Sequence, residues 1–191
     1  NHMKLDSVMQ LQNMNQMMKG QFNAYPVSSV MVLGIAGGNG LEHIDKNKYK
    51  KVYGIDINTE YLKAVEERYS DISEILECIQ VDLIDETNKL PNAELLVANL
   101  LIEYIGYDCF QKAVEHVCPK YVSCIIQINI DGSWVSDSPY IHVFDDLDKV
   151  HHQMEENLLI QAMKDIGYNL IAQTENLLPN GKKLVQLDFN C

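Results

Sequence analysis

Short apolar runs alternate with amphipathic stretches along most of the chain, from about Val30 to Ile130. The apolar runs, which are rich in β-branched and aliphatic residues, predict strands over residues 30–36, 51–56, 74–82, 93–99 and 121–130. Between them, Glu60–Tyr69 and Tyr107–Val117 place apolar residues at helical spacing, and Gly40–Lys46 can open a further helix. Strands that alternate with helices favour a parallel sheet covered on both faces.

The C-terminal part of the chain has a different pattern. Residues 148–166 predict a long helix, and Gly167 stands at its expected C-cap position. Tyr168–Asn176 and Lys183–Phe189 then predict two strands joined across Pro179–Gly181. Such a turn is typical of an antiparallel hairpin at a sheet edge.

The N-terminal part predicts one helix ahead of the sheet. Residues 5–18 form a loosely amphipathic, methionine-rich stretch, and Tyr25 follows it directly before a proline, where it is a candidate lid residue. Asn1 and His2 precede Met3 and resemble a tag remnant, so they take no part in the argument.

Composition disfavours several classes of partner. The net charge is −12 and Arg68 is the single arginine, which disfavours nucleic acid and anionic membranes as partners because both require a basic surface. No apolar run approaches the ~20 residues of a membrane span. The five cysteines form no Cys-x-x-Cys pair, so we expect free thiols in a reducing cytoplasm and neither a disulfide framework nor a zinc ribbon. We predict no metal site.

The stretch V-M-V-L-G-I-A-G-G-N-G over Val30–Gly40 is the first candidate site. A strand that runs into glycines and then a helix brings backbone N–H groups close to a ligand. The nicotinamide fingerprint G-x-G-x-x-G is not satisfied, because from Gly34 its second glycine falls on Ala36 and its third on Asn39. A dehydrogenase is therefore the weaker interpretation, and a tight turn without a ligand is the structural alternative.

Polar residues also close the next three predicted strands. Asp56 can accept both hydroxyls of a ribose, or it can be a helix N-cap or a solvated turn acid. Asp82 can accept a hydrogen bond from an exocyclic amine, and Leu83 offers a backbone N–H to the same base. Asn99 closes the fourth strand. Because the carboxyl ends of parallel strands face one crevice, these residues favour a nucleoside ligand.

With these motifs, the sequence resembles the class I S-adenosylmethionine-dependent methyltransferase family over roughly Val30–Ile130, and the terminal helix and hairpin look like that family's last strands. The resemblance implies an α/β, three-layer Rossmann-like methyltransferase fold, whose mostly parallel seven-stranded sheet ends in a C-terminal antiparallel hairpin. It divides the chain into an N-terminal helical lid over residues 1–29 and an S-adenosylmethionine-binding methyltransferase domain over residues 30–191. The implied cofactor is S-adenosylmethionine.

The resemblance also implies a role for each matching residue. The implied contacts with the amino acid part of the cofactor are Gly34, Ala36, Gly38 and Asn39. Asp56 is the implied contact of the ribose, and Ile57, Asp82 and Leu83 are those of the adenine. Asn99 is implied to lie beside the sulfonium end. The family usually has an acid where Gly34 stands and a glycine where Ala36 stands.

The expected activity is in-line methyl transfer to a small-molecule acceptor, in which the protein mainly aligns donor and acceptor and excludes water. An Asn-Pro-Pro-Tyr type of motif is absent, which disfavours adenine in nucleic acid or glutamine in protein as the acceptor. Candidate catalytic residues are Glu103, Tyr104 and His142, in the two loops expected to border the acceptor pocket, and the alternative for each is a solvated loop residue. The alternative functions are aminopropyltransferase-like alkyl transfer and non-catalytic nucleoside binding on the same fold. The oligomeric state is not predicted.

Overall fold

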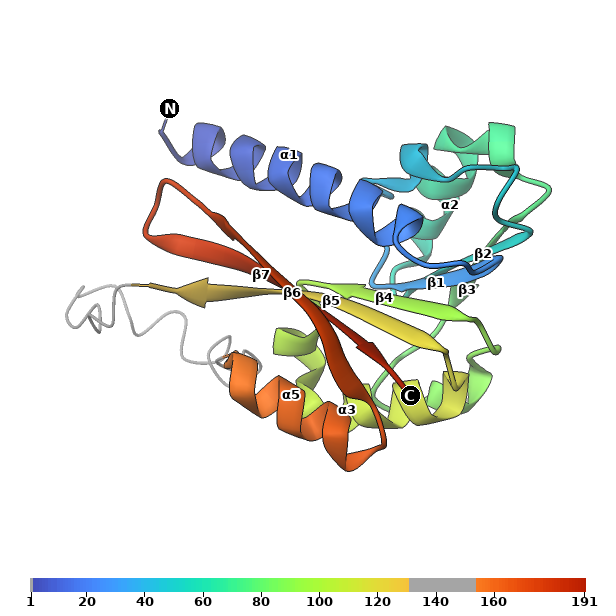
Figure 1. The fold of residues 1–191 in the computed structure, drawn as a ribbon. Helices are drawn as coiled ribbons and strands as arrows, with labels where there is room; N and C mark the ends of the chain where they lie inside the picture. The colour runs from blue at the N-terminus through green and yellow to red at the C-terminus, as the bar shows by residue number, and fades with distance from the viewer. Residues whose placement is uncertain (1, 131–153) are drawn as a thin grey trace.

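The computed structural model describes residues 2–130 and 154–191 as helices on both faces of one twisted sheet (Figure 1). Within these residues the strands are β1 (Ser29–Leu33), β2 (Lys51–Asp56), β3 (Leu76–Gln80), β4 (Leu95–Asn99), β5 (Tyr121–Asn129), β6 (Asn169–Leu177) and β7 (Lys182–Asn190). Their order across the sheet is β3-β2-β1-β4-β5-β7-β6.

The first five strands are parallel, and β7 lies antiparallel between β5 and β6. This arrangement confirms the predicted mostly parallel sheet and its C-terminal antiparallel hairpin. The chain winds outward from β1 through β2 to β3 and then returns to β4 on the other side of β1. In open α/β sheets, such a switch point opens a ligand crevice at the carboxyl ends of the strands.

Burial explains why the central strands are uninterrupted apolar runs. Leu95, Leu96, Val97 and Ala98 of β4 are all 0% exposed, because side chains on both faces of the strand are covered by other elements. Continuous apolar runs are typical of parallel strands buried on both faces, whereas half-buried strands alternate. The edge strand β6 is mostly exposed, as expected for a strand with one partner.

The helices form two layers. On one face lie α1 (His2–Asn23) and α2 (Thr59–Arg68), and on the other lie α3 (Ile102–Val117) and α5 (Glu156–Asp165) (Figure 1). Asn58 is the N-cap of α2, where its side-chain oxygen accepts the backbone N–H groups of Glu60 and Tyr61. Gly167, at a φ of 89°, follows the last turn of α5, as the sequence predicts. Among the described residues, no helix is long and apolar enough to cross a membrane.

Helix boundaries differ from the prediction at several places. Instead of a helix over Gly40–Lys46, only the short 3-10 turn η1 (Leu41–His43) forms, because Gly40 adopts a φ of 92° and Met18 of α1 lies against it. The predicted helix Tyr107–Val117 begins earlier, at Ile102, with a kink at Gly106. Of the predicted helix 148–166, the described part begins at Glu156, and residues 148–153 lie outside the described residues.

The N-terminal helix is longer than predicted and docks by its second half. It continues beyond Met18 to Asn23, and Met14, Met18, Gln21 and Phe22 are buried against the rest of the molecule. Val8, Met9 and Leu11 in its first half are exposed. One end of α1 is therefore built into the core, and the other projects along the crevice.

Candidate functional site

The loop after β1 needs glycine at two positions for reasons of packing. Gly34 has a φ of 66°, and a Cβ there would lie 2.9 Å from Leu101 Cδ1. Gly38 has a φ of 75°, and its Cβ would lie 2.8 Å from Tyr69 Cε2. Both combine a left-handed backbone with a close neighbour, which only glycine tolerates without strain. The loop thus folds down between α2 and the start of α3.

Asp56 at the end of β2 holds this loop in place. Its Oδ2 accepts the Ala36 N–H at 2.9 Å, and its Oδ1 accepts the Asn58 N–H at 2.9 Å. The first bond fixes Ala36 at a φ of 46°, which is unfavourable for a residue with a side chain. A carboxylate has about four acceptor positions, so Asp56 keeps acceptor capacity for ligand hydroxyls.

A cavity of ≈ 250 Å³ lies beside Asp56. Its lining residues are Gly34, Asp56, Ile57, Val81, Asp82, Leu83, Ile84, Leu101, Tyr104 and Ile105. It brings together the residues predicted to contact ribose and adenine, and we call it the nucleoside cavity. Ile57 and Ile84 are more than half exposed there, which offers apolar surface to a planar ring. Asp82 Oδ1 accepts the Ile84 N–H at 2.9 Å, an interaction that fixes the turn after β3.

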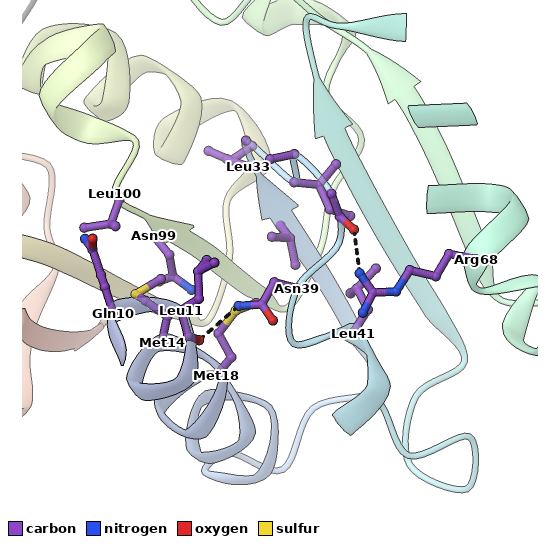
Figure 2. A pocket seen from close by; sticks show the side chains of 15 residues that line it. Gln10, Leu11, Met14, Met18, Leu33, Asn39, Leu41, Arg68, Asn99 and Leu100 are labelled. Atoms are coloured by element: carbon purple, nitrogen blue, oxygen red, sulfur yellow. Dashed lines mark hydrogen bonds between the residues drawn. The ribbon is translucent and has the colours of Figure 1, made fainter. Parts of the chain in front are cut away.

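A larger cavity of ≈ 700 Å³ lies between α1 and the glycine loop (Figure 2). Its lining residues are Gln10, Leu11, Met14, Met18, Val32, Leu33, Gly34, Ile35, Ala36, Gly37, Asn39, Leu41, Arg68, Asn99 and Leu100. It includes the predicted residues Gly34, Ala36, Asn39 and Asn99. Because Gly34 lines both cavities, the large cavity and the nucleoside cavity lie next to each other at the end of β1.

The side chain of Asn99 is held by the N-terminal helix through a buried polar network that the sequence did not reveal. Gln21 Nε2 donates to Asn99 Oδ1 at 2.9 Å and to Ser123 Oγ at 2.8 Å. Ser123 Oγ donates to Asp188 Oδ1 at 2.5 Å, and Tyr25 OH donates to Asp188 Oδ2 at 2.6 Å. Burial and the Asp188 carboxylate together raise the pKa of Tyr25 well above its usual value. Tyr25, which follows the end of α1, is thereby tied to β7.

A second polar cluster holds the middle of α1 to the glycine loop. Asn15 Nδ2 donates to Asn39 Oδ1 at 3.0 Å and also contacts the Glu42 carboxylate. Asn15 Oδ1 lies 2.6 Å from His43 Nε2. Asn39, predicted as a cofactor contact, thus also joins the loop to α1. No local sequence signal could have found Asn15 or Gln21, because their partners are remote in the chain.

The remaining predicted residues fall in different places. Gly38 is buried against Tyr69 and is not among the described lining residues of either cavity. Glu103 is 8% exposed at the start of α3. It too is not among the described lining residues of either cavity. Tyr104 is 54% exposed and lines the nucleoside cavity rather than the large one. His142 lies outside the described residues. The catalytic roles of Glu103, Tyr104 and His142 stay predictions.

No family model matches the sequence, and no curated protein matches it. Solved structures do match. A geranyl diphosphate methyltransferase in complex with S-adenosylmethionine superposes with a TM-score of 0.69 at 9% identity, covering 93% of this chain and 84% of that one. The N-methyltransferase NodS from Bradyrhizobium japonicum WM9 superposes with a TM-score of 0.66 at 12% identity, covering 94% of each chain. The chain has the class I methyltransferase fold.

The same fold also occurs in a protein that is named for another reaction. The [4+2]-cyclase SpnF superposes with a TM-score of 0.69 at 7% identity and covers 93% of this chain and 80% of its own. Likeness at such identities establishes the methyltransferase fold of this chain, while the reaction has to be argued from the site.

Proposed function

We propose that the chain binds S-adenosylmethionine across the carboxyl ends of β2, β1 and β4 and transfers its methyl group to a small-molecule acceptor. The observation that supports this most directly is the pair of cavities that share Gly34. One has the acids and apolar surfaces that suit a nucleoside, and the other begins where the sulfur end of such a cofactor would lie. A cofactor with an adenosine half and an amino acid half needs two connected spaces of this kind.

The described residues fit the adenosine half of the cofactor. Each carboxylate oxygen of Asp56 already accepts one backbone N–H group. The ribose hydroxyls can donate to the acceptor positions that are left on these two oxygens. Asp82 and the Leu83 backbone lie in the same cavity, in reach of an adenine edge. Ile57 covers the ring from outside, and Tyr104 adds an aromatic wall next to it. Bound here, the cofactor supplies an activated methyl group on a sulfonium.

The large cavity fits the amino acid half together with an acceptor. Gly34 brings the backbone close to the ligand, since a side chain at this position would collide with Leu101. Asn99, oriented by Gln21, stands beside the reacting end. Leu11, Met14, Met18 and Leu100 make the wall next to it mainly apolar. Methionine side chains adapt to ligand shape, so this wall favours a small acceptor with an apolar body.

The protein's contribution to the reaction is then mainly alignment and exclusion of water. α1 closes one side of the large cavity and is fastened at Asn15 and Gln21, so it presents a fixed wall against which an acceptor can be positioned. If the acceptor has to lose a proton, Glu103 and His142 are the candidate bases, and Tyr104 contributes to the shape of the nucleoside side.

Thermal unfolding with added ligands tests the proposal. A ligand present at 100 times its dissociation constant stabilises the native state by about 2.7 kcal/mol, which shifts the melting temperature by several degrees. We expect such a shift with S-adenosylmethionine and S-adenosylhomocysteine and none with NAD. A shift with decarboxylated S-adenosylmethionine alone would replace the proposal by aminopropyl transfer. No shift with any of these ligands would overturn it.

Turnover is tested separately, because SpnF has the same fold and another named reaction. Release of S-adenosylhomocysteine is measured on incubation with S-adenosylmethionine and a panel of small phenols, amines and carboxylic acids with apolar bodies. We expect release to depend on one acceptor class. Tight cofactor binding without release across the panel and across more polar acceptors would favour the non-catalytic alternative.

A further inference from the structure

Arg68, the only arginine of the chain, lies at the large cavity rather than on a remote surface. It is the last residue of α2, and it is among the residues that line this cavity. Its guanidinium points toward the glycine loop, where Nη1 donates to the Gly37 carbonyl at 3.1 Å (Figure 2). The same cavity is lined by Gly34, Ala36 and Asn99, so the guanidinium and the predicted site of the cofactor's amino acid part belong to one space.

The electrostatic setting makes this placement informative. The chain has a net charge of −12, and Arg68 is the one formally charged residue in the described lining of the large cavity. A guanidinium has five N–H donors, of which Gly37 accepts one. Within the described parts of the chain, no carboxylate forms an ion pair with Arg68. The charge is therefore not neutralised by the described residues around it.

The orientation of the guanidinium is set by its neighbours. The guanidinium carbon lies 5.1 Å from the centre of the Tyr69 ring, a distance typical of a cation–π contact. Tyr69 OH in turn donates to the Gly38 carbonyl at 2.6 Å and lies 3.1 Å from Glu42 Oε2. Burial and the Glu42 carboxylate raise the pKa of Tyr69 to about 12, so the ring stays neutral at pH 7. The side chain of Arg68 is thus held between the ring and the loop, at the exposed rim of the large cavity that it lines.

We propose that Arg68 binds the carboxylate of the amino acid part of S-adenosylmethionine. This inference rests on the proposed function. It assigns a binding residue to the amino acid half of the cofactor, where the acid that the methyltransferase family usually has at the position of Gly34 is absent. Planar guanidinium groups recognise carboxylates by two parallel, charge-assisted hydrogen bonds, and this is a geometry that lysine does not reproduce. Arg68 gives the site its specificity for a cofactor that keeps its carboxylate.

The structural alternative is that Arg68 only braces the glycine loop through Gly37. The two roles differ in one measurable respect. A brace affects every ligand that uses the loop, whereas a carboxylate anchor affects only ligands that have the carboxylate. Decarboxylated S-adenosylmethionine keeps the adenosine, the sulfonium and the amine, so it separates the two roles.

The test is titration calorimetry of the full chain and its Arg68→Gln and Arg68→Lys variants with S-adenosylmethionine and with its decarboxylated form. We expect Arg68→Gln to raise the dissociation constant of S-adenosylmethionine by about tenfold or more while that of the decarboxylated form changes by less than about twofold. Arg68→Lys, which keeps the charge and loses the paired geometry, falls between the parent and Arg68→Gln. Lys63→Gln is the matched control, because Lys63 is a cation on the same helix that pairs with Glu60 outside the cavity lining, and it leaves both constants unchanged.

Three outcomes overturn the proposal, and they are distinguishable. Equal weakening of both ligands in Arg68→Gln assigns Arg68 to bracing the loop. An unchanged affinity for both ligands removes Arg68 from the site. If the parent chain binds neither ligand, the proposed function itself is overturned, and the assignment of Arg68 with it. Urea unfolding of each variant verifies that the native state is retained, and Arg68→Lys preserves the test if Arg68→Gln does not fold.

Discussion

Gln21 and Asn99 exchange two hydrogen bonds between their side-chain amides: Gln21 Nε2 donates to Asn99 Oδ1 at 2.9 Å, and Asn99 Nδ2 donates to Gln21 Oε1 at 2.8 Å. Gln21 is 0% exposed and belongs to α1, whereas Asn99 lines the large cavity at the end of β4. The N-terminal helix therefore determines the orientation of a side chain in the candidate site.

This pairing predicts a large cost for removing the buried amide. Gln21→Leu should lower the free energy of unfolding by about 2 kcal/mol, because Ser123, which is 0% exposed, loses a hydrogen-bond donor without access to water and Asn99 loses both bonds to Gln21. Urea unfolding measures the change. Gln16→Leu is the matched control on the exposed side of the same helix and should stay within about 0.5 kcal/mol of the parent. Similar losses in both variants would show that the paired amide has no special role.

Asp56 is expected to matter for the cofactor more than for the fold. Asp56→Ala should raise the dissociation constant of S-adenosylmethionine by about tenfold or more, since a charged acceptor for the ribose is lost. Asp56→Asn, which keeps one acceptor oxygen, should have a smaller effect. Titration calorimetry provides both values, and Asp71→Ala, which removes an exposed acid paired with Lys46, serves as the charge-matched control. An unchanged affinity in Asp56→Ala would remove Asp56 from the site.

The backbone of the glycine loop predicts that a substitution is destabilising at Gly38 and tolerated at Ala36. Gly38→Ala should cost about 2 kcal/mol or more, because the new Cβ meets Tyr69 at 2.8 Å and the backbone has a φ of 75°. Ala36→Gly should not destabilise the protein, because it removes the strain of an alanine in the left-handed region. The opposing effect, a larger conformational entropy of the unfolded chain, costs less than about 1 kcal/mol. Denaturant unfolding of the two variants checks this contrast. A stable Gly38→Ala variant would contradict the described loop.

The contacts of Glu94 predict that the free energy of unfolding decreases at low pH. Its carboxylate accepts the Ser28 N–H at 3.1 Å and the Ser28 hydroxyl at 2.9 Å, and it pairs with Lys120 at 3.1 Å. These contacts lower the pKa of Glu94 to about 2, with the Ser28 backbone as the largest cause. Because the folded carboxyl has the lower pKa, its stabilising effect is present above a pH of about 4.5 and is lost as the pH falls toward about 2.

The measurement for Glu94 is unfolding free energy against pH. Glu94→Gln should be less stable than the parent by about 1 kcal/mol at pH 7, a value reduced for the partial exposure of the group, and the gap should close toward pH 2. Glu77→Gln is a comparison at a more exposed carboxylate, which pairs with Lys51, and it should change stability little. A gap for Glu94→Gln that is independent of pH would contradict the lowered pKa.

Local patterns were sufficient for the sheet but not for the surroundings of the site. The apolar run before Asn99 and the cap at Asn58 express preferences that act within a few residues, so strands and the start of α2 could be predicted. The extension of α1 to Asn23 could not, because Gln21 and Phe22 are ordered by partners from remote strands. The missing helix after Gly40 has the same cause, since Met18 of α1 lies in the space against Gly40. The fold brings Asp56 and Asp82, whose ligand contacts were inferred from the family resemblance, to the lining of one cavity.

The attachment of α1 has a consequence for the order of events during synthesis. Tyr25 bonds to Asp188, 163 positions later in the chain, and Gln21 bonds to Ser123, 102 positions later. On the ribosome, α1 therefore emerges well before β7, the strand that carries Asp188. Until β7 has inserted between β5 and β6, Met14 of α1 has only part of its cover, because it packs against Ile125 of β5 and Leu184 of β7. The wall of the large cavity at Met14 is thus complete only when β7 is in place, and this apolar surface stays partly exposed in a shorter nascent chain.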